Sequence, residues 1–105
     1  MLPRTFDLGL NGTLALSFGY SISGDKTKAK DEFGKISKED YLKIDPEFLG
    51  EFYVSVGDFD KALTQLERGF DIHSIMMIAL KVNPFLDPLR NDPRFKALMK
   101  KMNLE

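Results

Sequence analysis

The sequence predicts an all-α protein with two antiparallel helical hairpins of the same build, followed by C-terminal capping helices. Two stretches of the chain repeat each other at an offset of 33 residues. Each copy holds a Gly-Asp pair between two apolar segments, and this pair is typical of one helix ending and the next beginning. Behind the repeats, apolar residues spaced three, four and seven apart indicate one more amphipathic helix. We expect a single domain over residues 1–105, a fragment of an α-solenoid.

The first repeat is expected to span residues 13–37. Ahead of it, residues 1–12 alternate apolar side chains with proline and glycine, so they are expected to be irregular. Helices are predicted over 13–23 and 26–37, with Gly24 in the turn because glycine adopts the left-handed conformation at a helix end without a steric penalty. The first helix carries apolar residues on more than one face. Part of the apolar surface of this helix is therefore left exposed by the hairpin, and we expect homo-oligomers to form through this N-terminal helix edge.

The second repeat is expected to span residues 45–71, after a polar link over 38–43. Its helices are predicted over 45–56 and 59–70. The turn between them contains Gly57, which occupies the same place as the glycine of the first copy. A proline in the first helical turn, directly after an aspartate cap, supports the start of this repeat.

Residues 72–105 are expected to form a helical cap on the second repeat. The segment 72–81 is apolar nearly all round, and a helix of that kind is normally buried on most sides. Two prolines, Pro84 and Pro88, limit the next segment to a turn or a one-turn helix. A last helix over 92–102 would then cover the stack with its apolar stripe and turn its basic side chains outward.

The residues that recur at the offset of 33 each suit a helical hairpin. Glycine suits the turn, aspartate the cap of the following helix, and alanine the point where two helices cross closely. A leucine and a tyrosine four residues apart lie on one face of the preceding helix. The recurring pairs are Leu16 and Leu49, Tyr20 and Tyr53, Gly24 and Gly57, Asp25 and Asp58, and Ala29 and Ala62.

These residues resemble the signature of the tetratricopeptide repeat (TPR) family. The second copy matches the family's spacing with Leu49-Gly50, Tyr53, Gly57, Ala62 and Leu66, and the first with Leu16, Tyr20, Gly24, Ala29 and Phe33. Residues 82–98 are similar to the closing segment of bacterial TPR regions, which contains the pattern D-P-L-R-x-D-P-R-F. The resemblance implies a non-catalytic scaffold for protein–protein interaction. The alternative is the solenoid-terminating piece of a larger bacterial regulator, such as a transcriptional regulator, a cyclase or a kinase.

The resemblance also implies which residues bind a partner, because the first helix of each TPR hairpin lines the inner groove. The implied positions are Leu14, Phe18 and Ser21 in the first copy and Glu47, Glu51, Val54 and Ser55 in the second. They combine apolar with acidic side chains and lack the Lys, Arg and Asn with which chaperone-tail-binding TPR proteins hold a terminal carboxylate. The expected partner is therefore a protein or peptide with a basic amphipathic segment.

Composition and charge argue against several other classes. The chain has no cysteine and one histidine, which excludes thiolate and multi-histidine metal sites, and no cofactor is expected. Fifteen basic and sixteen acidic side chains give a net charge of -1, which argues against nucleic acid as a partner. No stretch approaches the ~18 apolar residues of a membrane span, so we expect no membrane partner and a cytoplasmic location. The charge is uneven, because residues 45–71 hold seven acidic and two basic side chains.

A small enzyme is the remaining alternative, and we expect no catalytic residues. Asp71, His73 and Ser74 offer an acid, an imidazole and a hydroxyl, but such close neighbours on a helix point in different directions and form no relay. The carboxylates of residues 45–71 could include a pair, but nothing in the sequence places two of them in an apolar cleft with a raised pKa.

Overall fold

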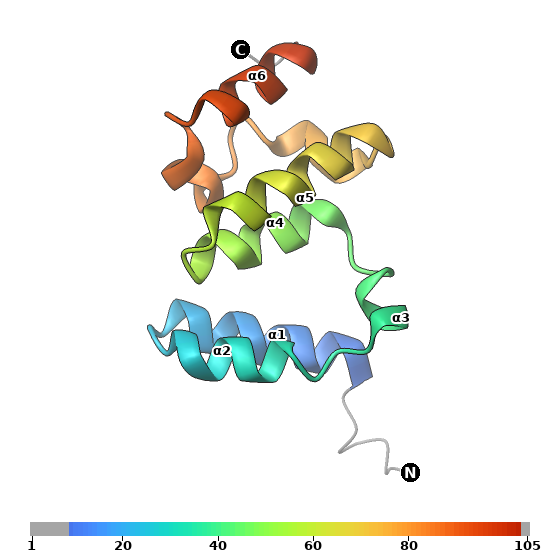
Figure 1. The fold of residues 1–105 in the computed structure, drawn as a ribbon, viewed down its shortest axis with the longest axis vertical. Coiled ribbons are helices and arrows are strands. Elements are labelled where there is room, and N and C mark those ends of the chain that lie inside the picture. Colours follow the sequence, from blue (N-terminus) through green and yellow to red (C-terminus); the bar gives the residue numbers. More distant parts are fainter. Residues whose placement is uncertain (1–8, 104–105) are drawn as a thin grey trace. The chain divides into compact units, whose positions relative to one another are not determined.

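The computed structural model describes residues 9–103, and all regular secondary structure in that range is helical (Figure 1). The chain divides into two compact units, with the boundary between Lys43 and Ile44. The helices of the first unit are α1 (Gly9–Ile22), α2 (Lys26–Phe33) and α3 (Lys38–Tyr41). Those of the second unit are α4 (Pro46–Ser55), α5 (Phe59–Asp71), α6 (Pro93–Lys101) and the 3-10 helices η2 (Ile75–Ala79) and η3 (Pro84–Leu89). The predicted all-α class is confirmed.

Each unit opens with two helices that lie side by side and are joined at a glycine (Figure 1). Gly24, between α1 and α2, has a φ of 96°, and Gly57, between α4 and α5, has a φ of 84°. Both lie in the left-handed region that side chains with a Cβ rarely adopt. Glycine is therefore required at both turns by the backbone itself.

The two turns also repeat the same hydrogen bonds. The residue after each glycine donates its N–H to the tyrosine carbonyl five residues earlier, at 2.9 Å in the first copy and 2.8 Å in the second. The aspartate side chain accepts from the N–H of the lysine three residues on, at 3.1 Å between Asp25 and Lys28 and at 3.3 Å between Asp58 and Lys61. The lysine ammonium groups lie 5.7 and 5.9 Å from the ring centroids of the repeated tyrosines. In both copies, the first helix therefore ends and the second helix is capped through the same hydrogen bonds.

The first unit departs from the sequence prediction at both ends of its helices. Residues 9–12 belong to α1, so the irregular stretch predicted over 1–12 was wrong there, and residues 1–8 lie outside the described range. Glycine inside a helix costs only about 1 kcal/mol relative to alanine, which leaves the helix intact. α2 ends at Phe33, before the predicted 37, and the predicted link contains α3, whose N-cap is Ser37.

The described hydrophobic core lies in the second unit. Its members from the helix pair are Val54, Ala62, Leu63 and Leu66, and those from the tail are Met77, Leu80, Leu86, Leu89, Phe95, Leu98 and Met99. α4 and α5 approach closely at Gly50, where an added Cβ would lie 2.7 Å from the Cδ2 of Leu66. The tail and the second helix pair therefore share one core, whereas their role as the cap of a solenoid stays a prediction.

The segment 72–81 differs most from its prediction, which was an α-helix buried on most sides. α5 runs to Asp71 and ends with His73 in the left-handed region, at a φ of 57°. Ser74 then begins a 3-10 helix of five residues, and Pro84 restricts the residue before it to an extended backbone. The segment between Ser74 and Pro84 is short, so only Met77 and Leu80 of its large apolar side chains are buried in the core. The other large apolar side chains of the segment are exposed.

Arg94 fixes the start of α6 to α5. Its guanidinium donates to Asp60 at 2.7 Å, to Glu67 at 2.8 Å and to Thr64 at 3.3 Å. Asp60 is exposed and Arg94 and Glu67 are only half-buried, so we expect the pairs to contribute orientation more than stability. Asp92 caps the helix by accepting from the N–H of Arg94 at 2.8 Å.

The left-handed turn predicts a contrast between two glycines of the first unit. Gly24→Ala should lower the free energy of unfolding by about 1–2 kcal/mol, because an L-residue is strained at a positive φ. Gly19→Ala, inside α1, is the matched control, since a Cβ has open space at both positions. It should leave stability unchanged or raise it by up to about 1 kcal/mol in urea unfolding. Equal effects would contradict the requirement for glycine in the turn.

The shared core predicts a second contrast, between two phenylalanines of the tail. Phe95 is 2% exposed, and Phe95→Ala should cost about 3–5 kcal/mol in urea unfolding through the cavity it leaves. Phe85 is 46% exposed, and Phe85→Ala should cost less than about 1 kcal/mol. A loss below about 1 kcal/mol for Phe95→Ala would mean that α6 is not docked in the core.

Candidate functional site

α4 carries the four partner-binding positions predicted for the second copy. Glu47 is 3% exposed, and Val54 is buried in the core of the second unit. Glu51 and Ser55 are half-buried, and the hydroxyl of Ser55 donates to the carbonyl of Phe52. Two of the four side chains are thus covered by the chain itself, and the other two remain accessible.

Asn83 joins the two glutamates of this set. Its side-chain nitrogen donates to Glu47 Oε2 at 2.6 Å and to Glu51 Oε2 at 2.9 Å. The oxygen of the same amide accepts from the N–H of Phe85 at 3.0 Å and so caps η3. Arg90 donates from Nη2 to the Asn83 carbonyl at 2.7 Å. One asparagine therefore holds the start of η3 against α4, across 36 residues of sequence for the bond to Glu47.

The environment of Glu47 changes its protonation. Burial raises the pKa of Glu47 to about 8, the hydrogen bond to Glu51 and its charge add to the rise, Asn83 opposes it, and Asp45 adds a small further rise. Glu47 therefore holds a proton near neutral pH. A carboxylate pair among residues 45–71 was left open by the sequence, but its burial was not predicted. The spacing of four places both carboxylates on one face of α4.

The three positions predicted for the first copy lie along α1. Leu14 and Phe18 are half-buried, and Ser21 is buried, with its hydroxyl donating to the Phe18 carbonyl at 2.8 Å. Leu16 and Ile22 on the same helix are 44% and 65% exposed. That these residues and those of α4 line one groove stays a prediction.

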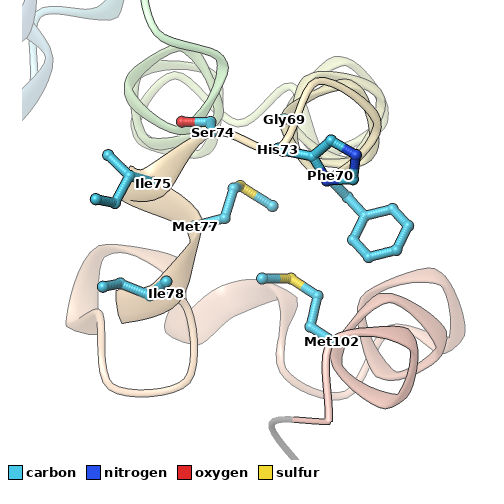
Figure 2. Close-up of a pocket in the computed structure, with 8 residues that line it drawn as sticks. All are labelled: Gly69, Phe70, His73, Ser74, Ile75, Met77, Ile78 and Met102. Carbon is cyan, nitrogen blue, oxygen red and sulfur yellow. The ribbon is translucent and has the colours of Figure 1, made fainter.

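A pocket of about 450 Å³ opens beside the C-terminal end of α5 (Figure 2). Met77, Met102 and Phe70 surround its interior, and Ile75 and Ile78 lie together on the opposite side of η2 (Figure 2). The pocket is lined by Gly69, Phe70, His73, Ser74, Ile75, Met77, Ile78 and Met102. This pocket was not predicted from the sequence, because residues 72–81 were expected to form a helix buried on most sides.

Asp71, His73 and Ser74 are not assembled as a relay. The Ser74 hydroxyl donates to Asp45 Oδ2 at 2.7 Å and accepts from the N–H of Met76 at 3.3 Å. It therefore links the N-cap of α4 to the N-cap of η2.

Among residues 9–103 no group of three or more His, Cys, Asp or Glu could hold a metal ion. Within the same range, no helix has the length and apolar character needed to cross a bilayer.

Comparison of the chain with protein-family models, with curated proteins and with solved structures found no match.

The raised pKa of Glu47 predicts a pH dependence of stability. Between about pH 4.5 and about 8 the folded chain keeps a proton that the unfolded chain releases, so the free energy of unfolding should fall as the pH rises through this window. The loss should be on the order of 5 kcal/mol, complete above the folded-state pKa. Urea unfolding across this pH range measures it.

The matched variant for that measurement is Glu47→Gln, which keeps an acceptor for Asn83 and cannot ionise. Its stability should lack this fall, so the difference from the wild type should vary with pH. Glu39→Gln, at an exposed position of α3, should keep the wild-type dependence. Parallel curves for the wild type and Glu47→Gln would show that Glu47 ionises normally in the folded chain.

Proposed function

We propose that this chain is a TPR-type scaffold that binds a protein or peptide partner and performs no catalysis. The observation that carries the proposal is the agreement of the two helix turns, residue for residue. Four features recur at the offset of 33. They are the positive φ of the glycine, the hydrogen bond from the next N–H to the tyrosine carbonyl five residues earlier, the aspartate cap, and the lysine over the tyrosine ring. A helical repeat built in this way cannot bury its apolar faces alone, and stacking then produces extended surfaces for binding.

Small residues at the helix crossings support the same proposal. Ala29 and Ala62 have no exposed surface, and each lies one turn into the second helix of its pair. Gly50 in α4 and Ser17 in α1 stand at matching positions of the two copies, and both are buried. The hydroxyl of Ser17 folds back to the Thr13 carbonyl at 2.8 Å, so it occupies little space between the helices.

On this proposal, contact with the partner in the second copy involves Glu51 and Ser55, since the other two predicted positions are buried. Glu51 faces solvent in part, and the region from Asp45 to Asp71 holds seven acidic and two basic side chains. An acidic surface of this kind attracts basic partners and speeds their association. The proposal includes a cytoplasmic location for the scaffold.

A second candidate function is the closing end of a longer helical repeat in a bacterial regulator. The contacts of the closing segment favour it, because Arg94 binds Asp60 and Glu67 of α5 while Leu86, Leu89 and Phe95 fill the core. A tail seated in this way would cover the last helix pair of a solenoid. A reading frame that continues upstream with further repeats would favour this candidate.

Capture of a partner and its titration test the first proposal. We expect a basic protein or peptide to be retained by the wild-type chain and identified by mass spectrometry. Glu51→Lys should then weaken its affinity about tenfold or more at low salt, through repulsion of the basic partner. Glu51→Gln removes the charge and keeps an acceptor for Asn83, so about threefold weakening is expected.

The control for this titration is Glu39→Lys, which makes the same charge change at an exposed position of α3. It should leave the affinity within about twofold of the wild type. If Glu51→Lys folds normally by circular dichroism and binds as tightly as the wild type, the acidic surface of α4 is not the binding site.

A further inference from the structure

The segment from Ile72 to Val82 exposes several apolar side chains of the second unit, and this set is here called the 72–82 face. It comprises large apolar side chains of which more than half is exposed. These are Ile72 at 55%, Ile75 at 75%, Met76 at 52%, Ile78 at 70% and Val82 at 75%. We propose that two copies of this chain pair symmetrically through the 72–82 face.

The area of the face fits a dimer. A side chain of this size carries on the order of 150 Å² of apolar surface, so the five expose roughly 500 Å² together. That is at the upper end of the largest patch on a typical monomer, about 300–600 Å². Two such faces would bury roughly 1,000 Å², which is about the least that a specific interface needs. Interfaces at this low end of the size range are typically weak and transient.

The charges on the face fit a second copy better than a charged partner. Residues 72–80 contain no Asp, Glu, Lys or Arg, so two copies can meet without burying a charge or facing a like charge. An exposed acid, Asp71, precedes the face, and an exposed base, Lys81, lies near its other end, just before Val82. When a twofold axis runs perpendicular to the segment, the two copies run antiparallel, and Asp71 of each lies near Lys81 of the other.

Two isoleucines protrude together from the face. Ile75 and Ile78 are three residues apart on a 3-10 helix, where such side chains eclipse, and they project on one side of η2 (Figure 2). Both also belong to the lining of the pocket that contains Phe70, Met77 and Met102. The protruding pair and the pocket thus lie on the two sides of η2. In a symmetric interface each contact is made twice with the roles exchanged, so the protruding pair of one copy can pack against the same pair of the other.

Oligomeric state tests the inference directly. In sedimentation equilibrium from about 10 to about 500 µM, the wild-type chain should shift from monomer to dimer. The double variant Ile75→Glu/Ile78→Glu should stay monomeric, and folding should be retained because both side chains are exposed. Ile22→Glu, which places the same charge on an apolar residue of α1 that is 65% exposed, should dimerise like the wild type.

Charge reversal tests the symmetric arrangement. Asp71→Lys and Lys81→Asp should each weaken dimerisation about tenfold, since either change creates two like-charge contacts per dimer. The double reversal should restore wild-type dimerisation to within about threefold. Amide hydrogen exchange adds a measurement without substitutions: protection over residues 72–82 should increase with protein concentration, and protection over α1 should not.

Three results would overturn the inference. One is a wild-type chain that remains monomeric at about 500 µM. Another is a dimer that Ile22→Glu dissociates and Ile75→Glu/Ile78→Glu does not, which would assign the interface to the N-terminal helix edge. The third is a double reversal that dimerises no better than the single reversals. None of these bears on the proposed scaffold function, because Glu51 and the partner titration involve a different element.

Discussion

The left-handed turn at a glycine is the constraint on which both helix pairs depend. Two helices can lie antiparallel after a short connection only if the backbone reverses at once, and Gly24 and Gly57 do this at φ values of 96° and 84°. The reversal returns an N–H to the last turn of the first helix and leaves the next residue to cap the second. Close packing of the pair then follows, which explains the buried alanine one turn further on in both copies.

The helix pairs could be predicted because their determinants are local. Turn glycine, capping aspartate and crossing alanine lie within six residues of each other, and their hydrogen bonds close within the same stretch. The start of α4 was predictable for the same reason, since Asp45 and Pro46 form a cap and a first turn by themselves. The limits of α2 were not, because the short helix α3 with its own cap at Ser37 interrupts the polar link.

The candidate site was predictable only in part. A spacing of four placed Glu47 and Glu51 on one face of α4, but their protonation depends on a partner 36 residues away, and nothing near Asn83 indicates it. Asn83 is the N-cap of η3, through its side-chain oxygen. That its free N–H groups also reach two carboxylates depends on how η3 packs on α4, which is set by tertiary contacts. The burial of Glu47 agrees with its raised pKa, since a protonated carboxyl is buried at a lower free-energy cost than an ionised one.

The exposed apolar surface is a consequence of these polar links. Ser74 and Asn83 tie the two ends of the intervening segment to α4, through Asp45 at one end and through Glu47 and Glu51 at the other. A segment fixed at both ends cannot rotate as a free helix would to bury its most apolar side. With so few residues between the anchors, only Met77 and Leu80 reach the core, and the remaining isoleucines point outward. An apolar face toward solvent is thus what the hydrogen bonds of the tail impose, and a second copy of the same face is the surface that best removes it from water.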